Sequence, residues 1–426
     1  MFRTYYFTEM PYPTIPGPEF TDVVLGTMPS RWLDPDVTHD AYHKYYDLVR
    51  TADDLGLDVM FNEHHAMMAN LNAAMPLSVA IAARETKNAR LLVLGNPVAN
   101  RPDPVRVATE MAMIDVISHG RLDCGFVRGT WGELSATNAR PTDMGPRLYE
   151  AIDLIQKAWA SHDGPFNWEG EFFHHRQVNI VPRPYQQPHP PIWVTTLSVG
   201  SVPSIANRGF NVATMFFGTK AAKKIFDVYR DLYEQKFGTQ PHPEKLAYSA
   251  FCLVADTDEE ALREAPKLQD FVKQATRAAK GQYDPPGYLD PQVRAVMLKA
   301  EAEEPGSAFK FDAAGRADPR DLVDAGIAFF GTPDSVFEQL KTFFYAVGGF
   351  GHFMGMFQAS SMTYGYTAKS LRLFAEQVLP RFRAEVYEPW LKEHGLHQLM
   401  LARDDAAAAT PNTDAAAAPG STRAAA

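Results

Sequence analysis

Short β-rich runs that alternate with helical patterns are the feature that most constrains the fold of this chain. In its first third, the runs typical of strands lie at 4–7, 58–62, 89–95 and 121–127. The patterns typical of helices between them lie at 40–55, 77–84 and 104–118. Strands and helices that alternate in this way form βαβ units, which build a parallel sheet, so the chain is expected to be of the α/β class.

The same alternation continues, with wider spacing, through the rest of the chain. Further strands are expected at 192–195, 211–215, 247–255 and 349–357. Further helices are expected at 145–160, 202–207, 219–237, 331–348 and 367–382. Eight strands with helices between them favour a closed (β/α)8 TIM barrel over an open doubly wound sheet.

Two segments lengthen the later loops of the predicted barrel. Residues 161–190 alternate in polarity and contain several prolines, which indicates a hairpin-like insertion. Residues 257–330 are too long for one βα connection and rich in charge, so we expect helices that form a lid or flank over the active face. The Ala-rich segment 403–426 has too few large apolar side chains to pack. The sequence therefore predicts one barrel domain, 1–402, and a disordered tail.

Composition and charge restrict the partners of the protein. With 46% hydrophobic and 22% charged residues the chain has ample material for a large core. Its net charge of −10 and its scattered basic residues favour neither a nucleic acid nor an anionic membrane as a partner. Two cysteines, Cys124 and Cys252, make no disulfide framework, and no apolar run reaches the about 18 residues that span a bilayer. We expect a cytoplasmic protein.

Catalytic and binding residues of a barrel lie at the carboxyl ends of its strands, so the loops after the strands are the first candidates for a functional site. The second strand is followed by Asn62-Glu63-His64-His65. Adjacent histidines do not face the same way, which makes them a poor metal pair, and a polar loop with one hydrogen-bonded histidine is the alternative. The third strand is followed by Gly95-Asn96-Pro97, which permits a turn close to a bound ring or forms an ordinary turn.

The next two loops carry residues suited to a phosphate. Arg128 lies beside Gly129 after the fourth strand, where an arginine would bind phosphate with two hydrogen bonds and Trp131 would line a ligand pocket. A surface arginine and a packed tryptophan are the alternative. The fifth strand leads into Ser198-Val199-Gly200-Ser201 at the start of a helix. Its hydroxyl and backbone N–H groups indicate an anion site or an ordinary helix cap.

Other catalytic motifs are absent from the sequence. There is no GxGxxG after a strand, no GxxxxGK[ST] and no GxSxG, which removes the motif basis for dinucleotide binding, phosphoryl transfer by a P-loop and serine hydrolysis. His174 and His175 have no third ligand at a regular spacing, so we expect them to be exposed and predict no metal site.

Taken in order, these loops and their flanking segments resemble the luciferase-like monooxygenase family, over about residues 1–385. The strings that carry the resemblance are FNEHH at 61–65, PDPVRVATEMAMIDVISHGRLDCGFVRG at 102–129, PRPYQQPHPPIWV at 182–194, SVGSVPSIANRGF at 198–210, GTPDSV at 331–336 and FAEQVLPRF at 374–382. Together they are specific for the family, but none of them identifies a substrate.

The resemblance implies a flavin-dependent monooxygenase with FMN across the carboxyl face of the barrel. Reduced FMN, supplied by a separate NAD(P)H-dependent reductase, would react with O2 to give a flavin C4a-peroxide. That species would oxygenate a small, mostly apolar organic substrate, with aldehydes or ketones as the first choice. By motif matching, the FMN phosphate would be bound by Arg128, Ser198 and Ser201 and by backbone amides near Val199 and Gly200.

The resemblance also assigns roles near the flavin ring. The Gly95-Asn96 peptide matches a non-prolyl cis bond under the ring, and His64 matches a catalytic histidine that acts as a general base or hydrogen-bonds the oxygenated flavin and the substrate intermediate. Trp131 would line the substrate pocket, and the protein would form a homodimer. Two alternatives stay open, namely an F420-dependent oxidoreductase on the same barrel and a non-catalytic flavin-binding subunit.

Overall fold

The computed structural model describes residues 1–14, 29–134, 136–275, 317–359 and 361–396, and a few positions between 291 and 315. The predicted tail, 403–426, and residues 276–290 and 300–313 of the predicted lid segment lie outside the described residues. Within the described residues, no helix is both long enough and apolar enough to cross a membrane.

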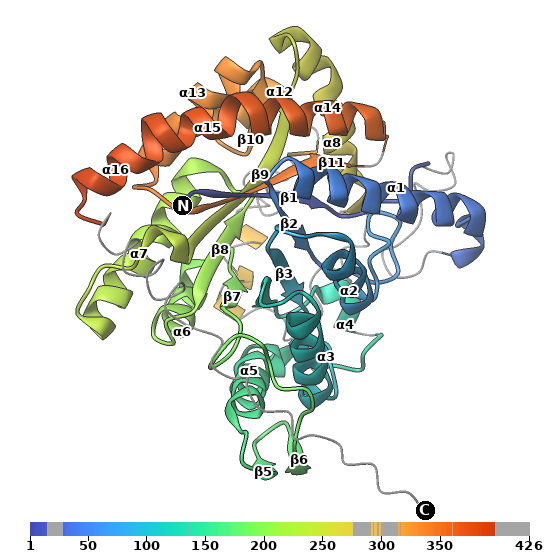
Figure 1. Ribbon diagram of the computed structural model, residues 1–426, viewed down its shortest axis with the longest axis vertical. Helices are drawn as coiled ribbons and strands as arrows, with labels where there is room; N and C mark the ends of the chain where they lie inside the picture. The colour runs from blue at the N-terminus through green and yellow to red at the C-terminus, as the bar shows by residue number, and fades with distance from the viewer. Residues whose placement is uncertain are drawn as a thin grey trace, which may run out of the picture.

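Eight parallel strands of the described chain close into a barrel (Figure 1). In order around the barrel they are β1 (Arg3–Thr8), β2 (Asp58–Phe61), β3 (Leu91–Asn96), β4 (Leu122–Phe126), β7 (Ile192–Thr195), β8 (Asn211–Met215), β9 (Leu246–Val254) and β11 (His352–Gln358). The barrel closes where Arg3 of β1 pairs with His352 of β11. The predicted TIM barrel is therefore confirmed.

Apolar side chains fill the interior of the barrel. Tyr5, Met60, Leu92, Trp193 and Met354, from five different strands, belong to one buried cluster there. A parallel sheet covered by helices is buried on both faces, which explains the nearly continuous apolar runs of β3 and β11. Because side chains fill the interior, the barrel offers no pore, and a ligand site must lie at one of its ends.

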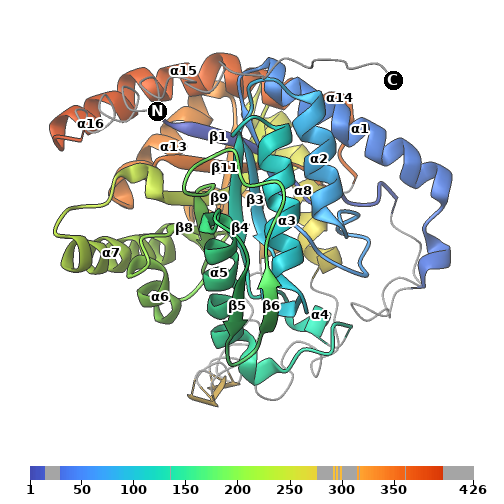
Figure 2. The same ribbon diagram turned by 60° about the horizontal axis from the view of Figure 1, so that its bottom comes forward.

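Helices surround the strands, as Figure 2 shows from a second direction. They include α1 (Pro35–Asp54), α2 (Met75–Glu85), α3 (Pro104–Ile117), α5 (Met144–Ala160), α6 (Val202–Ala206), α7 (Gly218–Phe237), α13 (Pro333–Ala346) and α14 (Tyr364–Leu373). Helix α1 begins before the predicted position 40, because the Asp34 carboxylate accepts hydrogen bonds from the backbone N–H groups of Asp36 and Val37 and caps the helix.

The two predicted insertions have different structures. In the first, β5 (Phe166–Glu169) and β6 (His174–Val178) form the antiparallel hairpin that the sequence indicated. The described part of the second contains the expected helices, α8 (Asp258–Ala275) and α12 (Pro319–Asp324). It also contains a strand that was not predicted, β10 (Ala328–Gly331), which pairs with the second half of β9. Four residues are too few to give a periodic signal.

The closing helix extends beyond its predicted end at 382. Helix α14 continues through π-helical turns at Phe374–Val378 and Phe382–Tyr387, on either side of α15 (Leu379–Arg381), into α16 (Glu388–Glu393). Pro380 in α15 has no N–H to donate within a regular helix, and wider turns accommodate such a position.

Candidate functional site

The loops predicted to carry function begin at neighbouring strand ends on the carboxyl rim of the barrel. Phe61 at the end of β2 pairs with Val93, and Asn96 at the end of β3 pairs with Phe126. Phe126 at the end of β4 pairs in turn with Val194 of β7. The loops that bear His64, Asn96, Arg128 and Ser198 therefore leave the barrel side by side, as the parallel topology predicted.

A carboxylate from a distant part of the sequence binds both histidines of the β2 loop. Glu133 lies in the short helix α4 (Trp131–Leu134), which follows the β4 loop. Its Oε1 accepts a hydrogen bond from the backbone N–H of His65 at 2.8 Å and lies 3.0 Å from Nδ1 of that ring. The same oxygen lies 3.4 Å from Nδ1 of His64. One carboxylate thus bonds His65 and lies beside the buried Nδ1 of His64, which has no hydrogen-bond partner among the described residues.

The other oxygen of Glu133 is held by Thr130. The backbone N–H of Thr130 donates to Oε2 at 3.0 Å, and the Thr130 hydroxyl donates to the same atom at 2.7 Å. A threonine before a helix, bonded to a glutamate three residues later, forms the side-chain arm of a capping box. The start of α4 therefore fixes the carboxylate that the histidines contact.

A second buried carboxylate, Glu63, completes the binding of His65. Its Oε1 lies 3.1 Å from Nε2 of His65, so both ring nitrogens of this histidine face carboxylates. Glu63 also accepts from Nη2 of Arg101 at 2.7 Å and from the backbone N–H of Met75, at the start of α2, at 3.0 Å. Arg101 supplies the positive charge that a carboxylate with 1% of its side chain exposed requires.

These contacts raise the pKa of both histidines. Burial favours the neutral ring of His64, but the Glu133 carboxylate outweighs burial and raises the pKa of His64 to about 9. Hydrogen bonds to Glu133 and Glu63 raise the pKa of His65 to about 9 as well. Burial alone would raise the pKa of Glu133, yet the two histidines hold it well below its usual range. The carboxylates therefore favour the protonated form of both imidazoles.

A buried amide network supports the β2 loop from below. Nδ2 of Asn62 donates to the carboxylate of Glu9, at the end of β1, at 2.7 Å, and Nδ2 of Asn70 donates to Oδ1 of Asn62 at 3.0 Å. Asn72 closes the network with a hydrogen bond of 2.6 Å to the backbone carbonyl of Asn62. These bonds hold the segment that carries His64 and satisfy its buried polar groups.

The exit of β3 brings the backbone close to the β4 loop. A Cβ atom on Gly95 would lie 2.5 Å from Cγ1 of Val127, so only glycine fits there. The non-prolyl cis peptide bond joins Leu94 and Gly95, which makes the prediction of the Gly95-Asn96 peptide wrong by one bond. The pairing of β3 with β4 shifts register in this stretch, and the sequence does not reveal which of its bonds departs from regular geometry.

Buried amide groups without partners lie beside this exit. Asn96 is fully buried, and its Oδ1 accepts from Nε of Arg101 at 3.0 Å, whereas its Nδ2 has no partner among the described residues. Asn100 is 4% exposed, and neither its amide oxygen nor its amide nitrogen has a hydrogen-bond partner among the residues that the structure describes. Buried polar groups normally form hydrogen bonds. Their donors and acceptors fit a flavin, whose ring edge carries carbonyl oxygens and ring nitrogens.

The candidate phosphate residues lie on the adjacent loops. Arg128 is half-buried directly after β4, and Ser198 and Ser201 are exposed after β7, with their Oγ atoms 3.5 Å apart. Val199 and Gly200 lie between them in a single 3₁₀ turn. Thr196 fixes this turn, because its hydroxyl accepts from the N–H of Ser198 at 3.1 Å. Hydroxyl and guanidinium donors on neighbouring loops suit a phosphate.

Trp131 is the first residue of α4, next to the Arg128 loop. Its role in the substrate pocket stays a prediction.

Neither thiol is expected to take part in binding or catalysis, because Cys124 and Cys252 are both buried within strands. Burial raises the pKa of each thiol well above its ordinary value.

Sequence reasoning did not identify Glu133, Arg101 or Asn100 as functional residues and gave no role to Glu63. Glu133 carried a local signal, since Thr130 followed three residues later by a glutamate is the capping-box pattern. That pattern predicts a helix start but not the histidines that the glutamate binds, because the contact spans 68 positions of the sequence.

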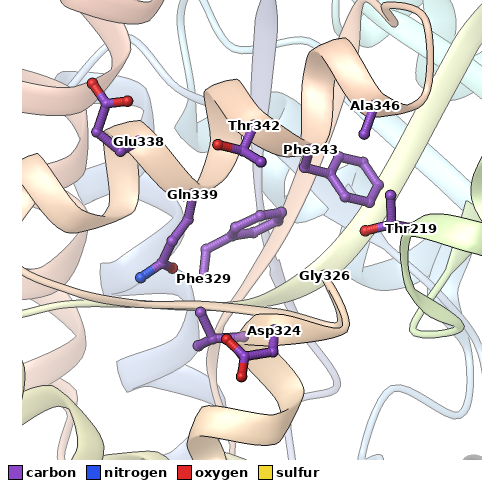
Figure 3. A pocket seen from close by; sticks show the side chains of 10 residues that line it. Thr219, Asp324, Gly326, Phe329, Glu338, Gln339, Thr342, Phe343 and Ala346 are labelled. Atoms are coloured by element: carbon purple, nitrogen blue, oxygen red, sulfur yellow. The ribbon is translucent and has the colours of Figure 1, made fainter.

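Two cavities lie away from these residues. One is a recess of about 360 Å³ outside the barrel, between α13 and the segment around β10. Figure 3 shows side chains that line it. Both amide atoms of Gln339 in this recess bond the backbone of Phe330, at 3.0 and 2.8 Å. The Thr219 hydroxyl donates to the carbonyl of Ala325 at 3.3 Å. These polar groups serve the local backbone, so the recess offers them to no ligand.

A larger cavity of about 600 Å³ lies at the amino ends of the strands. Its charged walls are internally paired, since Arg90 bonds Asp123 through two nitrogens, at 2.8 and 2.7 Å, and Arg3 bonds Asp58 at 3.0 Å. Residues at this end of a barrel serve stability. Among the described residues, no three His, Cys, Asp or Glu side chains gather in a way that would hold a metal ion. His174 is exposed on the hairpin as expected, whereas His175 is half-buried, because it lies opposite Trp168 in the pairing of β5 and β6.

Comparisons with known proteins identify the family. The family model for luciferase-like monooxygenase matches residues 23–349. The oxygenase component of a flavin-dependent trigonelline monooxygenase from Acinetobacter baylyi is 31% identical over 247 residues, which cover 57% of this chain and 67% of the relative.

Solved structures share the fold. Monooxygenase RslO1 from Streptomyces bottropensis matches with a TM-score of 0.69 and 24% identity, over 89% of this chain and 99% of that one. The oxygenating constituent of 3,6-diketocamphane monooxygenase from Pseudomonas putida, a type II Baeyer–Villiger monooxygenase in complex with FMN, matches with a TM-score of 0.67 and 21% identity, over 89% and 98% of the two chains. The family model and the relative show that this chain is an enzyme that belongs to the luciferase-like monooxygenase family.

Proposed function

We propose that the protein is the oxygenase of a two-component system that uses reduced FMN and O2 to oxygenate a small, mostly apolar organic substrate. The observation that carries the proposal is the pair of buried amides, Asn96 and Asn100, whose polar atoms lack partners within the described chain. They lie at the carboxyl rim, beside the close contact of Gly95 with Val127. A flat, polar-edged ring at this rim would satisfy them.

Each part of the cofactor has a counterpart in the chain. Arg128, Ser198 and Ser201, with the backbone N–H groups near Val199 and Gly200, would bind the phosphate. Gly95 and Asn96 would contact the ring, because they lie at the exit of β3 on the carboxyl rim, where the buried Asn96 has an amide nitrogen without a partner among the described residues. These residues leave three adjacent strand ends, as a ligand that extends across the rim requires.

When bound, reduced FMN supplies the electrons and activates O2 for transfer to the substrate. The protein would position the substrate, exclude water and supply a proton donor at Nε2 of His64. Trp131, at the start of α4, would line the substrate side. Aldehydes and ketones are the first class to test, and the Baeyer–Villiger activity in the name of one structural neighbour supports this choice.

The proposal includes two protein partners. A separate NAD(P)H-dependent flavin reductase would supply reduced FMN, and the name of the trigonelline relative, an oxygenase component, supports such a division. A second copy of the chain would cover α2 and α3, which expose large apolar side chains to solvent. These are Leu77, Ile81, Met113, Val116 and Ile117. Exposed apolar patches of this kind mark protein interfaces. The cytoplasm is the proposed location.

Anaerobic titrations with reduced FMN and with reduced F420 test the cofactor. We expect tight binding of reduced FMN, and about tenfold or greater weakening in Arg128→Ala through loss of a charge-assisted hydrogen bond. Arg183→Ala is the control, because Arg183 is exposed on the loop before β7. Tight binding of F420 together with turnover that needs no oxygen would overturn the proposal.

A further inference from the structure

The two adjacent histidines of the β2 loop have different bonding. His65 has a carboxylate at each ring nitrogen, Glu133 at Nδ1 and Glu63 at Nε2. His64 faces Glu133 with Nδ1, which is buried and lies 3.4 Å from Oε1 of Glu133 without a hydrogen bond among the described residues. The imidazole of His64 is partly exposed, with 27% of its side chain accessible. Because Nδ1 of His64 is buried against Glu133, Nε2 is the nitrogen of this ring left to meet a ligand.

The charges around His64 come from three elements of the rim. Glu9 follows β1, Glu63 and His65 belong to the β2 loop, and Glu133 belongs to α4. Arg101 pairs with Glu63, so that carboxylate is already neutralised. The close partner left for His64 is Glu133, whose position Thr130 fixes through two hydrogen bonds. An opposite charge at this distance favours the charged form of a histidine.

We propose that Glu133 is a positioning residue that keeps His64 protonated, so that Nε2–H donates a hydrogen bond to an oxygen acceptor at the site. This inference rests on the proposed function, because it assigns the chemistry of the group bound there. It selects between the two roles that the resemblance gives His64. A ring that already carries both protons donates hydrogen bonds and does not accept a proton as a general base.

The oxygen acceptor is either the carbonyl oxygen of the substrate or an oxygen of the reduced cofactor, and pH separates the two sources. Deprotonation of His64 removes a charge-assisted hydrogen bond, which weakens whichever ligand Nε2 contacts. If the partner is the cofactor, the dissociation constant for reduced FMN rises as the pH passes the pKa of His64, near 9. If the partner is the substrate, that constant is unchanged and KM rises instead.

The test is a histidine NMR titration of the full-length protein without cofactor, which measures protonation independently of turnover. The His64 signal is identified by its absence in His64→Gln. We expect a pKa near 9 in the wild type, and a decrease of about 1–2 pH units in Glu133→Gln, which keeps the shape and a hydrogen-bond acceptor for Thr130. The alkaline limit of activity should shift by the same amount.

Glu169→Gln is the matched control. Glu169 lies 3.4 Å from Nδ1 of His174, the distance found between Glu133 and His64, but both residues are exposed on the hairpin. Exposed ion pairs contribute little, so the control should leave the titration of His64 and the activity unchanged.

A wild-type pKa of His64 near 6.5 would overturn the inference even if Glu133→Gln did not fold. An unchanged pKa in folded Glu133→Gln, or an alkaline limit that stays constant while the pKa falls, would overturn it as well. Failure of the proposed function would look different. In that case the protein would show no turnover with reduced FMN, although His64 would still titrate near 9.

Discussion

A Cβ atom on Gly129 would lie 2.4 Å from Nδ2 of Asn100, the buried side chain whose amide atoms have no partner among the described residues. Gly129 also has a φ of +85°, which residues with a side chain rarely adopt. The loop after β4 and the turn after β3 are therefore in contact through a glycine. Any side chain at this position would displace the amide that we assign to the flavin site.

Gly129→Ala should destabilise the protein and weaken FMN binding. The positive φ and the displaced Asn100 together predict a loss of about 1–3 kcal/mol in the free energy of unfolding. Gly145→Ala is the control, because no atom lies within 4 Å of a Cβ at Gly145, in the first turn of α5. Chemical denaturation compares the two. Equal stability of both variants would contradict the contact.

Ser198→Ala combined with Ser201→Ala should weaken FMN binding by about tenfold or more, because each hydroxyl contributes about 0.5–1.5 kcal/mol as a donor to the phosphate. The matched control is the ligand riboflavin, which has the same ring without the phosphate. Its affinity should not change in the double variant. If riboflavin loses as much affinity as FMN, the turn does not bind the phosphate.

The apolar face of α2 and α3 should bury itself in a homodimer. Leu77 is 68% exposed and Ile117 is 49% exposed, so a glutamate at both positions would place two charges in the interface. Light scattering after size exclusion should give twice the chain mass for the wild type and a single chain mass for the double variant. Tyr345→Glu, at a residue 48% exposed on α13, should leave the dimer intact. A monomeric wild type would refute this prediction.

His352 should make the fold sensitive to mild acid. Burial lowers the pKa of His352 to about 3, although Glu244 opposes the shift, whereas an unfolded chain titrates near 6.5. Between these values the unfolded state binds a proton that the folded state does not. The unfolding free energy therefore falls as the pH decreases from 6.5 towards 3, by up to about 1.4 kcal/mol per pH unit.

His352→Gln removes this titration and should flatten the dependence of urea midpoints on pH between 6.5 and 4. The exposed residue His162 provides the control, since His162→Gln should retain the wild-type slope. A slope that His352→Gln does not change would assign the acid sensitivity to other groups.

Much of the fold followed from the sequence because parallel strands buried on both faces give continuous apolar runs. The positions of β3 and β8 agree closely with the predicted strands, and the parallel topology then placed the loops of His64, Arg128 and Ser198 on one rim. These residues could be identified because the loops that follow strands carry the polar groups of a barrel.

The contacts between the loops could not be predicted in the same way. Glu133 and His65 meet only because the barrel brings the ends of β2 and β4 onto one rim. No local sequence pattern indicates a contact between residues that lie 68 positions apart. The strand β10 is too short for a periodic signal, and the sequence does not mark which bond at Gly95 is cis. The pKa values of the histidines depend on these contacts and became evident only with the structure.

The most direct test of the account is the fate of oxygen. The protein, a flavin reductase, FMN and NAD(P)H are incubated under ¹⁸O2 with a panel of aldehydes and ketones, and each product is examined by mass spectrometry. If the protein is the proposed oxygenase, we expect a product that contains one ¹⁸O atom and is absent when the reductase or oxygen is withheld. A product that forms without oxygen, or that carries oxygen from water alone, would contradict it.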